Sequence, residues 1–260
     1  MKTKPLQAHI TATYIMLRYG MAALAIALPF LLVIGGFLLA ELPWQASMSA
    51  YYHAGNGAMR DGFVGILFAL GVFLMLYKGL TFFENGALNL AGFLLLIVAL
   101  VPMTWDCGNA CPRFSWHGAA AVVFFLAIAY VCIFRAKDTL PLIDDPATEK
   151  RFARAYDILG GCMLASPAIA FVVKWLLPPQ QGKGSIVFFI EAAGVIIFGI
   201  YWIVKSCEIG KTHAEQEAVE GRLYIDPYRL TDVFRPIKIE RVREQDREDP
   251  LRSKKSSHGS

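Results

Sequence analysis

The sequence predicts an all-α fold, a bundle of six transmembrane helices with both chain termini in the cytoplasm. Of its 260 residues, 56% are hydrophobic and only 18% are charged. The charges are missing from long blocks, and a helix needs roughly 20 mainly apolar residues to cross a bilayer. Lys and Arg are also distributed unevenly between the segments that join these blocks. This combination is typical of an integral membrane protein.

Six apolar segments are long enough to span the membrane. They cover residues of about 19–40, 58–77, 85–105, 114–134, 158–177 and 184–204. The first is too long for the apolar core of a cleaved signal peptide, so it is expected to remain as a spanning helix. Residues 1–206 are therefore predicted to form the membrane domain. Residues 207–260 are predicted to form a polar cytoplasmic tail, disordered from about 241, where charge, Ser and Gly dominate.

The positions of Lys and Arg predict the orientation. An even number of spans places both termini on one side, and all Lys and Arg except Arg60, Arg113, Lys174 and Lys183 then fall on that side. The positive-inside rule assigns it to the cytoplasm. Trp44, Trp105, Trp116, Trp175 and Trp202 fall at predicted span ends, as interfacial anchors do. The tail has nearly balanced basic and acidic residues, which argues against a nucleic-acid partner.

The stretch Ser49-Ala-Tyr-Tyr-His53, with Arg60-Asp61 shortly after it, is the most informative part of the chain. The uncharged segment 62–77 behind it is too short to cross a bilayer. The second helix must therefore begin near Gly57, which draws Arg60 and Asp61 below the headgroups. Ionisable groups at that depth are costly, so they normally pair, face protein or serve a function.

Five ionisable residues are predicted to share a layer about 10 Å thick at the outer boundary of the bundle. They are His53, Asp61, Asp106, His117 and Glu191. Imidazole with carboxylate is the ligand set of catalytic zinc, so His53, His117, Asp61 and Asp106 are candidate metal ligands. A metal would activate water and polarise a carbonyl, with Asp61 and Glu191 as catalytic carboxylates. Ser49 and Tyr52 would donate hydrogen bonds to the developing oxyanion.

The sequence leaves several functions open. The first is a metal-dependent hydrolase that acts on a lipid or another amphiphile at the outer leaflet. The second is a membrane accessory or scaffold protein, in which pairs such as Arg60–Asp61 or Arg113–Glu191 only satisfy their own charges. The third is an oligomeric transporter or proton-handling protein that uses Glu191, although no ionisable relay is expected within the spans of the inner half. A haem held by His53 and His117 is a further alternative.

Cys107-Gly-Asn-Ala-Cys111 lies in a predicted outer loop. Outside the cytoplasm such a pair is expected to form a small disulfide. A redox pair is the alternative, although the spacing is not Cys-x-x-Cys.

The pattern Ser49-x-x-x-His53, then Asp61 and the helix-borne His117, resembles the CREST membrane hydrolases, the group of alkaline ceramidases and adiponectin-receptor-type proteins. The resemblance implies zinc-dependent cleavage of lipid amides, with both His as ligands. Members of that superfamily have seven spans and a His-x-x-x-His pair in the last. This chain has six predicted spans and Glu191 instead. The segment Arg60-Asp-Gly-Phe-Val-Gly65 is also similar to segments of uncharacterised bacterial integral membrane proteins. This similarity implies a bacterial inner-membrane location.

Overall fold

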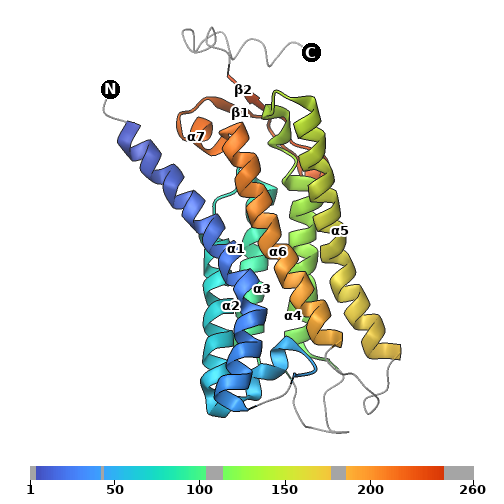
Figure 1. Cartoon of the computed structure of the whole chain (residues 1–260). Helices are drawn as coiled ribbons and strands as arrows, with labels where there is room; N and C mark the ends of the chain where they lie inside the picture. The colour runs from blue at the N-terminus through green and yellow to red at the C-terminus, as the bar shows by residue number, and fades with distance from the viewer. Residues whose placement is uncertain (1–3, 42–43, 104–113, 177–185, 243–260) are drawn as a thin grey trace.

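The computed structural model describes residues 4–41, 44–103, 114–176 and 186–242 and consists mainly of long helices (Figure 1). The six long helices are α1 (Lys4–Ala40), α2 (Ala58–Leu76), α3 (Phe82–Leu100), α4 (Trp116–Tyr130), α5 (Pro146–Leu176) and α6 (Ile186–Thr212). All six belong to segments long and apolar enough to cross a membrane. The predicted all-α architecture with six spans is confirmed.

The helices form a closed ring in chain order. Each packs against its neighbours in the sequence, and α6 returns to pack against α1. At one end of the ring lie the 3₁₀ turns η1 (Met48–His53) and η2 (Gly55–Gly57). We call this the η1 end, at the bottom of Figure 1.

The opposite end is called the α7 end, and the chain both enters and leaves the described structure there (Figure 1). It carries a π-helical turn η4 (Val131–Arg135), η5 (Leu140–Leu142), α7 (Ala214–Val219), β1 (Leu223–Ile225), η6 (Leu230–Phe234) and β2 (Ile239–Arg241). The two strands pair antiparallel, with Leu223 opposite Arg241 and Ile225 opposite Ile239.

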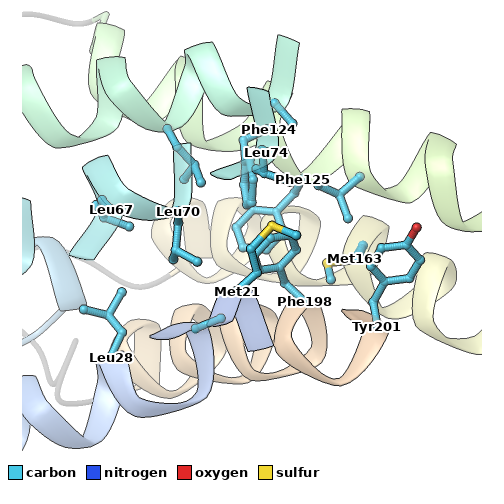
Figure 2. Packing of buried hydrophobic residues seen from close by; sticks show 14 of the residues in the cluster. Met21, Leu28, Leu67, Leu70, Leu74, Phe124, Phe125, Met163, Phe198 and Tyr201 are labelled. Atoms are coloured by element: carbon cyan, nitrogen blue, oxygen red, sulfur yellow. The ribbon is translucent and has the colours of Figure 1, made fainter. Parts of the chain in front are cut away.

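A single apolar core fills the ring along its length. Figure 2 shows side chains of several helices meeting there: Met21 and Leu28 of α1, Leu67, Leu70 and Leu74 of α2, Phe124 and Phe125 of α4, Met163 of α5, and Phe198 and Tyr201 of α6. Large apolar side chains also cover the outside, among them Phe37 at 72% and Phe171 at 70% exposure. An exterior this apolar requires lipid rather than water around it.

The helices α2 and α3 approach closely at two glycines. A Cβ added at Gly71 would lie 2.8 Å from the carbonyl oxygen of Gly92, and one added at Gly92 would lie 2.5 Å from that of Gly71. Without a hydrophobic effect between helices in lipid, close backbone packing of this kind holds spans together.

The helix ends differ from the predicted ones mainly at the α7 end. The helix α5 begins at Pro146 and α6 continues to Thr212, so much of the expected connector and the start of the expected tail are helical. The tail up to residue 242 is folded onto the bundle. Trp202 is fully buried and packs edge-on against Tyr77, so it is a core residue and not the predicted interfacial anchor. Burial inside the ring outweighs the interfacial preference of indole because α6 extends beyond this point.

Candidate functional site

The turn η1 is fixed in place by hydrogen bonds at its start. Ser47 caps it, since its hydroxyl accepts a hydrogen bond from the backbone N–H of Ala50 at 3.2 Å. The backbone N–H of Met48, the first residue of η1, donates to Glu191 Oε2 of α6 at 2.7 Å. Just before the turn, the carbonyl of Ala46 accepts from the N–H of Phe188 at 3.1 Å. The first two turns of α6 therefore hold η1 at the end of the ring.

Aromatic packing fixes the other side of η1. The Tyr51 ring is 1% exposed and lies against Gly36 of α1, where an added Cβ would stand 2.4 Å from the ring. The same ring contacts Phe188, with 5.9 Å between centroids. A side chain at position 36 would displace Tyr51, so the glycine is needed for η1 to sit against α1.

The fixed turn brings Ser49 to His117. Ser49 Oγ lies 2.8 Å from His117 Nε2, and His117 Nδ1 lies 2.7 Å from the carbonyl oxygen of Val101, just after α3. The imidazole is buried, whereas Ser49 is only partly buried. His117 stands in the first turn of α4, which Ser115 caps through a hydrogen bond from Gly118.

These contacts assign the proton positions in the pair. A carbonyl oxygen only accepts, so Nδ1 of His117 carries the hydrogen and donates it to Val101. In a neutral imidazole Nε2 is then the acceptor, and the Ser49 hydroxyl donates to it. A hydroxyl that donates to an imidazole, itself oriented by a third group, is the arrangement of an activated serine nucleophile. The sequence predicted both residues as parts of one site, with the imidazole as a metal ligand and Ser49 as a donor to the oxyanion.

His53 and Asp61 do not join this pair. His53 is exposed, and its Nε2 lies 3.2 Å from the carbonyl oxygen of Met103, two residues beyond the carbonyl that His117 contacts. Asp61 pairs with Arg60 at 3.3 Å, as the structural alternative predicted, and its side chain is 75% exposed. The predicted ligand Asp106, the Cys107–Cys111 disulfide and the Arg113 partner of Glu191 lie outside the described residues.

The described residues do not fit a zinc ion. In those parts of the chain, no three His, Cys, Asp or Glu side chains form a group able to hold a metal. Both ring nitrogens of His117 are engaged, and the Nε2 lone pair points at Ser49. A zinc ligand would have to give up that hydrogen bond, so we derive no step through a metal.

A second polar cluster, absent from the sequence prediction, lies at the α7 end. Three buried ion pairs form there: Arg18–Glu215, Arg135–Asp138 and Lys205–Glu208. Lys205 also donates to Thr139 Oγ1 at 3.0 Å, and the Tyr156 hydroxyl donates to Glu208 at 3.1 Å. The helices of this half extend beyond the predicted spans and bury ionisable groups there: Arg18, Glu84, Arg135, Lys205 and Glu208.

This cluster joins the tail to the bundle. Glu215 of α7 accepts hydrogen bonds from Arg18 of α1 and from the Tyr77 hydroxyl. Asp138 accepts from the backbone N–H of Ile237 at 3.0 Å, and Arg135 donates to the carbonyl of Arg235. The cluster therefore anchors residues 213–242 to the bundle. The one feature of the sequence that could have indicated this cluster is the spacing of Lys205 and Glu208, because residues three apart on a helix can form an ion pair.

Comparisons with protein-family models, with curated proteins and with solved structures find no match for this chain.

Proposed function

We propose that the protein is a membrane hydrolase that cleaves an ester or amide bond of an amphiphile at the η1 end, with Ser49 as nucleophile and His117 as general base. The observation that carries the proposal is the chain of hydrogen bonds from Ser49 through His117 to the Val101 carbonyl. Six helices long and apolar enough to cross a membrane make the chain a multi-pass membrane protein.

The reaction proceeds in two balanced halves. The Ser49 oxygen attacks the substrate carbonyl carbon while His117 Nε2 takes the hydroxyl proton, and the departing alcohol or amine then receives that proton from His117. The resulting acyl ester on Ser49 is cleaved by water, whose proton passes to His117. The hydroxyl is restored when the serine oxygen leaves with that proton.

The setting of Ser49 supports an amphiphilic substrate. Aromatic side chains surround the η1 end, and Trp44, Phe114 and Trp116 are more than half exposed there. Exposed aromatic residues gather at the level of the lipid headgroups. A substrate that reaches Ser49 at this level has its scissile group at the interface and its apolar chain in the bilayer.

We assign the α7 end to the cytoplasm of a bacterial inner membrane and the η1 end to the outer side, because Lys and Arg concentrate at the α7 end. Zinc remains a prediction from the sequence and is tested by measuring the metal content of the purified protein. The serine mechanism requires activity to survive chelation.

The experiment compares hydrolysis of p-nitrophenyl octanoate by the wild type, Ser49→Ala and His117→Ala in detergent micelles. Each variant is expected to lose at least about 10³-fold in kcat, since nucleophile and base act as a unit. Ser166→Ala is the matched control, because it removes a buried hydroxyl that donates to Ile190 of α6 at 3.1 Å, away from the pair. A Ser49→Ala rate within twofold of the wild type would contradict the proposal.

A further inference from the structure

A groove between the inner ends of α5 and α6 is lined by basic and apolar side chains. Its volume is about 350 Å³, and it is lined by Thr148, Arg151, Phe152 and Ala155 of α5 and by Val204 and Lys211 of α6. Phe152, Ala155 and Val204 form an apolar floor, and two cations stand at the rim. Within the described parts of the chain, neither Arg151 nor Lys211 is in an ion pair, although both are exposed.

The neighbouring carboxylates are already engaged. Asp157 pairs with Lys137, and Glu208 pairs with Lys205 inside the bundle. Asp145 accepts hydrogen bonds from the Thr148 hydroxyl and from the backbone N–H groups of Ala147 and Thr148, in the first turn of α5. Those hydrogen bonds, together with the nearby charge of Arg151, lower the pKa of Asp145, which is fully exposed. Asp145 offsets part of the Arg151 charge, and Lys211 keeps an excess of positive charge at the rim, which a ligand with an anionic group would neutralise.

The depth of the groove matches the headgroup layer. On α5 the lipid-facing surface reaches at least to Ile158, which is 65% exposed, and Arg151 lies seven residues or about 10 Å farther along the axis. On α6, Lys211 lies eight residues or about 12 Å beyond the exposed Ile203. From about 10–12 Å beyond the apolar surface, long basic side chains can place their charge at the level of the lipid phosphates. Basic pockets between transmembrane helices bind anionic headgroups in this way.

We propose that the groove between α5 and α6 binds an anionic phospholipid, with the phosphate between Arg151 and Lys211 and the start of an acyl chain on Phe152 and Val204. The apolar floor favours a lipid over a free phosphate, because a soluble anion leaves the floor exposed to water. The site lies at the opposite end of the ring from Ser49, so it is separate from the proposed reaction.

The test measures lipid retained by the purified full-length protein after exchange into mixed micelles of phosphatidylglycerol and phosphatidylcholine, by native mass spectrometry. The wild type is expected to retain phosphatidylglycerol preferentially. In Arg151→Gln with Lys211→Gln the preference should fall about 25-fold, roughly fivefold for each cation removed. Lys150→Gln with Arg154→Gln is the matched control, since it removes two exposed cations of α5 that do not line the groove. That control should keep the preference.

Three results would overturn the proposal. One is an equal affinity of the wild type for both lipids. Another is an equal loss in the control pair, which would mean general attraction to a basic surface. The third is displacement of the bound lipid by millimolar inorganic phosphate alone, which would mean that the site recognises a free anion. Elution of all variants at the wild-type volume in gel filtration shows that folding is intact.

Discussion

Replacing Arg18 with Met is expected to destabilise the bundle by an amount that depends strongly on pH. Arg18 is 1% exposed and donates to Glu215, whose own side chain is 8% exposed. Without the guanidinium, the carboxylate keeps only the hydrogen bond from the Tyr77 hydroxyl at 3.1 Å. Removing one partner of a buried ion pair costs about 3–5 kcal/mol because the other charge is left uncompensated.

Protonation of Glu215 limits that cost. Burial already raises the pKa of this carboxyl, and loss of the nearby Arg18 charge raises it further. Neutralising a carboxyl of ordinary pKa costs about 4 kcal/mol at pH 7 but only about 1 kcal/mol at pH 5. A pKa raised in the folded state means stability that is present at low pH and is lost as the pH rises through the folded pKa. The free-energy loss in Arg18→Met should therefore shrink from about 4 to about 1 kcal/mol between pH 7 and pH 5.

The assay is reversible unfolding in mixed micelles, followed by the fluorescence of Trp202, which is fully buried in the core. The double variant Arg18→Met with Glu215→Gln is the control, since it cannot ionise at position 215 and should lose the pH dependence. A loss below about 1 kcal/mol at pH 7, or one that is equal at pH 5, would refute the reasoning.

Three further predictions concern separate parts of the fold. Glu191→Gln should keep near-wild-type hydrolysis, because the amide oxygen still accepts the hydrogen bond from η1. Glu191→Leu should lose about 100-fold in kcat, because the serine is then misplaced. An equal loss in both variants would favour proton handling by this carboxyl. Gly92→Ala should cost about 1–3 kcal/mol in micelle unfolding, since its Cβ meets the α2 backbone, while Gly86→Ala, which has open space on the same helix, should be stabilising or neutral. The lowered pKa of Asp145 means that its cap on α5 is lost as the pH falls through that pKa. Hydrogen exchange of the backbone amides in the first turn of α5, corrected for the intrinsic rate, should therefore accelerate toward low pH in the wild type. The same exchange should not accelerate in Asp145→Asn.

The spans were predictable because lipid imposes one simple requirement, an apolar segment of sufficient length. The same rule fails at the α7 end, where a helix carries charge and is still buried. Lys205 looks like the start of a polar tail, but Glu208 three residues later compensates its charge, and Thr139 of another segment accepts a hydrogen bond from it. Such compensation depends on residues far apart in the chain, such as Arg18 and Glu215, and hydropathy does not register it.

The candidate site was predictable in its residues and not in their partners. The sequence assigned Ser49 and His117 to one outer site through topology alone, with Ser49 as an oxyanion donor and His117 as a metal ligand. Which nitrogen of the imidazole faces the serine depends on the Val101 carbonyl, a backbone group that no motif identifies. Glu191 was expected as a catalytic or titrating carboxylate, but it contacts the backbone of η1 and positions the turn.

The most direct measurement of the central claim is covalent labelling of Ser49 by a fluorophosphonate that carries an alkyl chain, read from the mass of the peptide containing residues 48–53. An activated serine forms a stable phosphonyl adduct, so the wild type should gain the mass of the probe on Ser49. His117→Ala should slow the labelling by at least about 100-fold, and Ser49→Ala should abolish it. No adduct on the wild type, or equal labelling with and without the imidazole, would contradict the assignment of the pair as nucleophile and base.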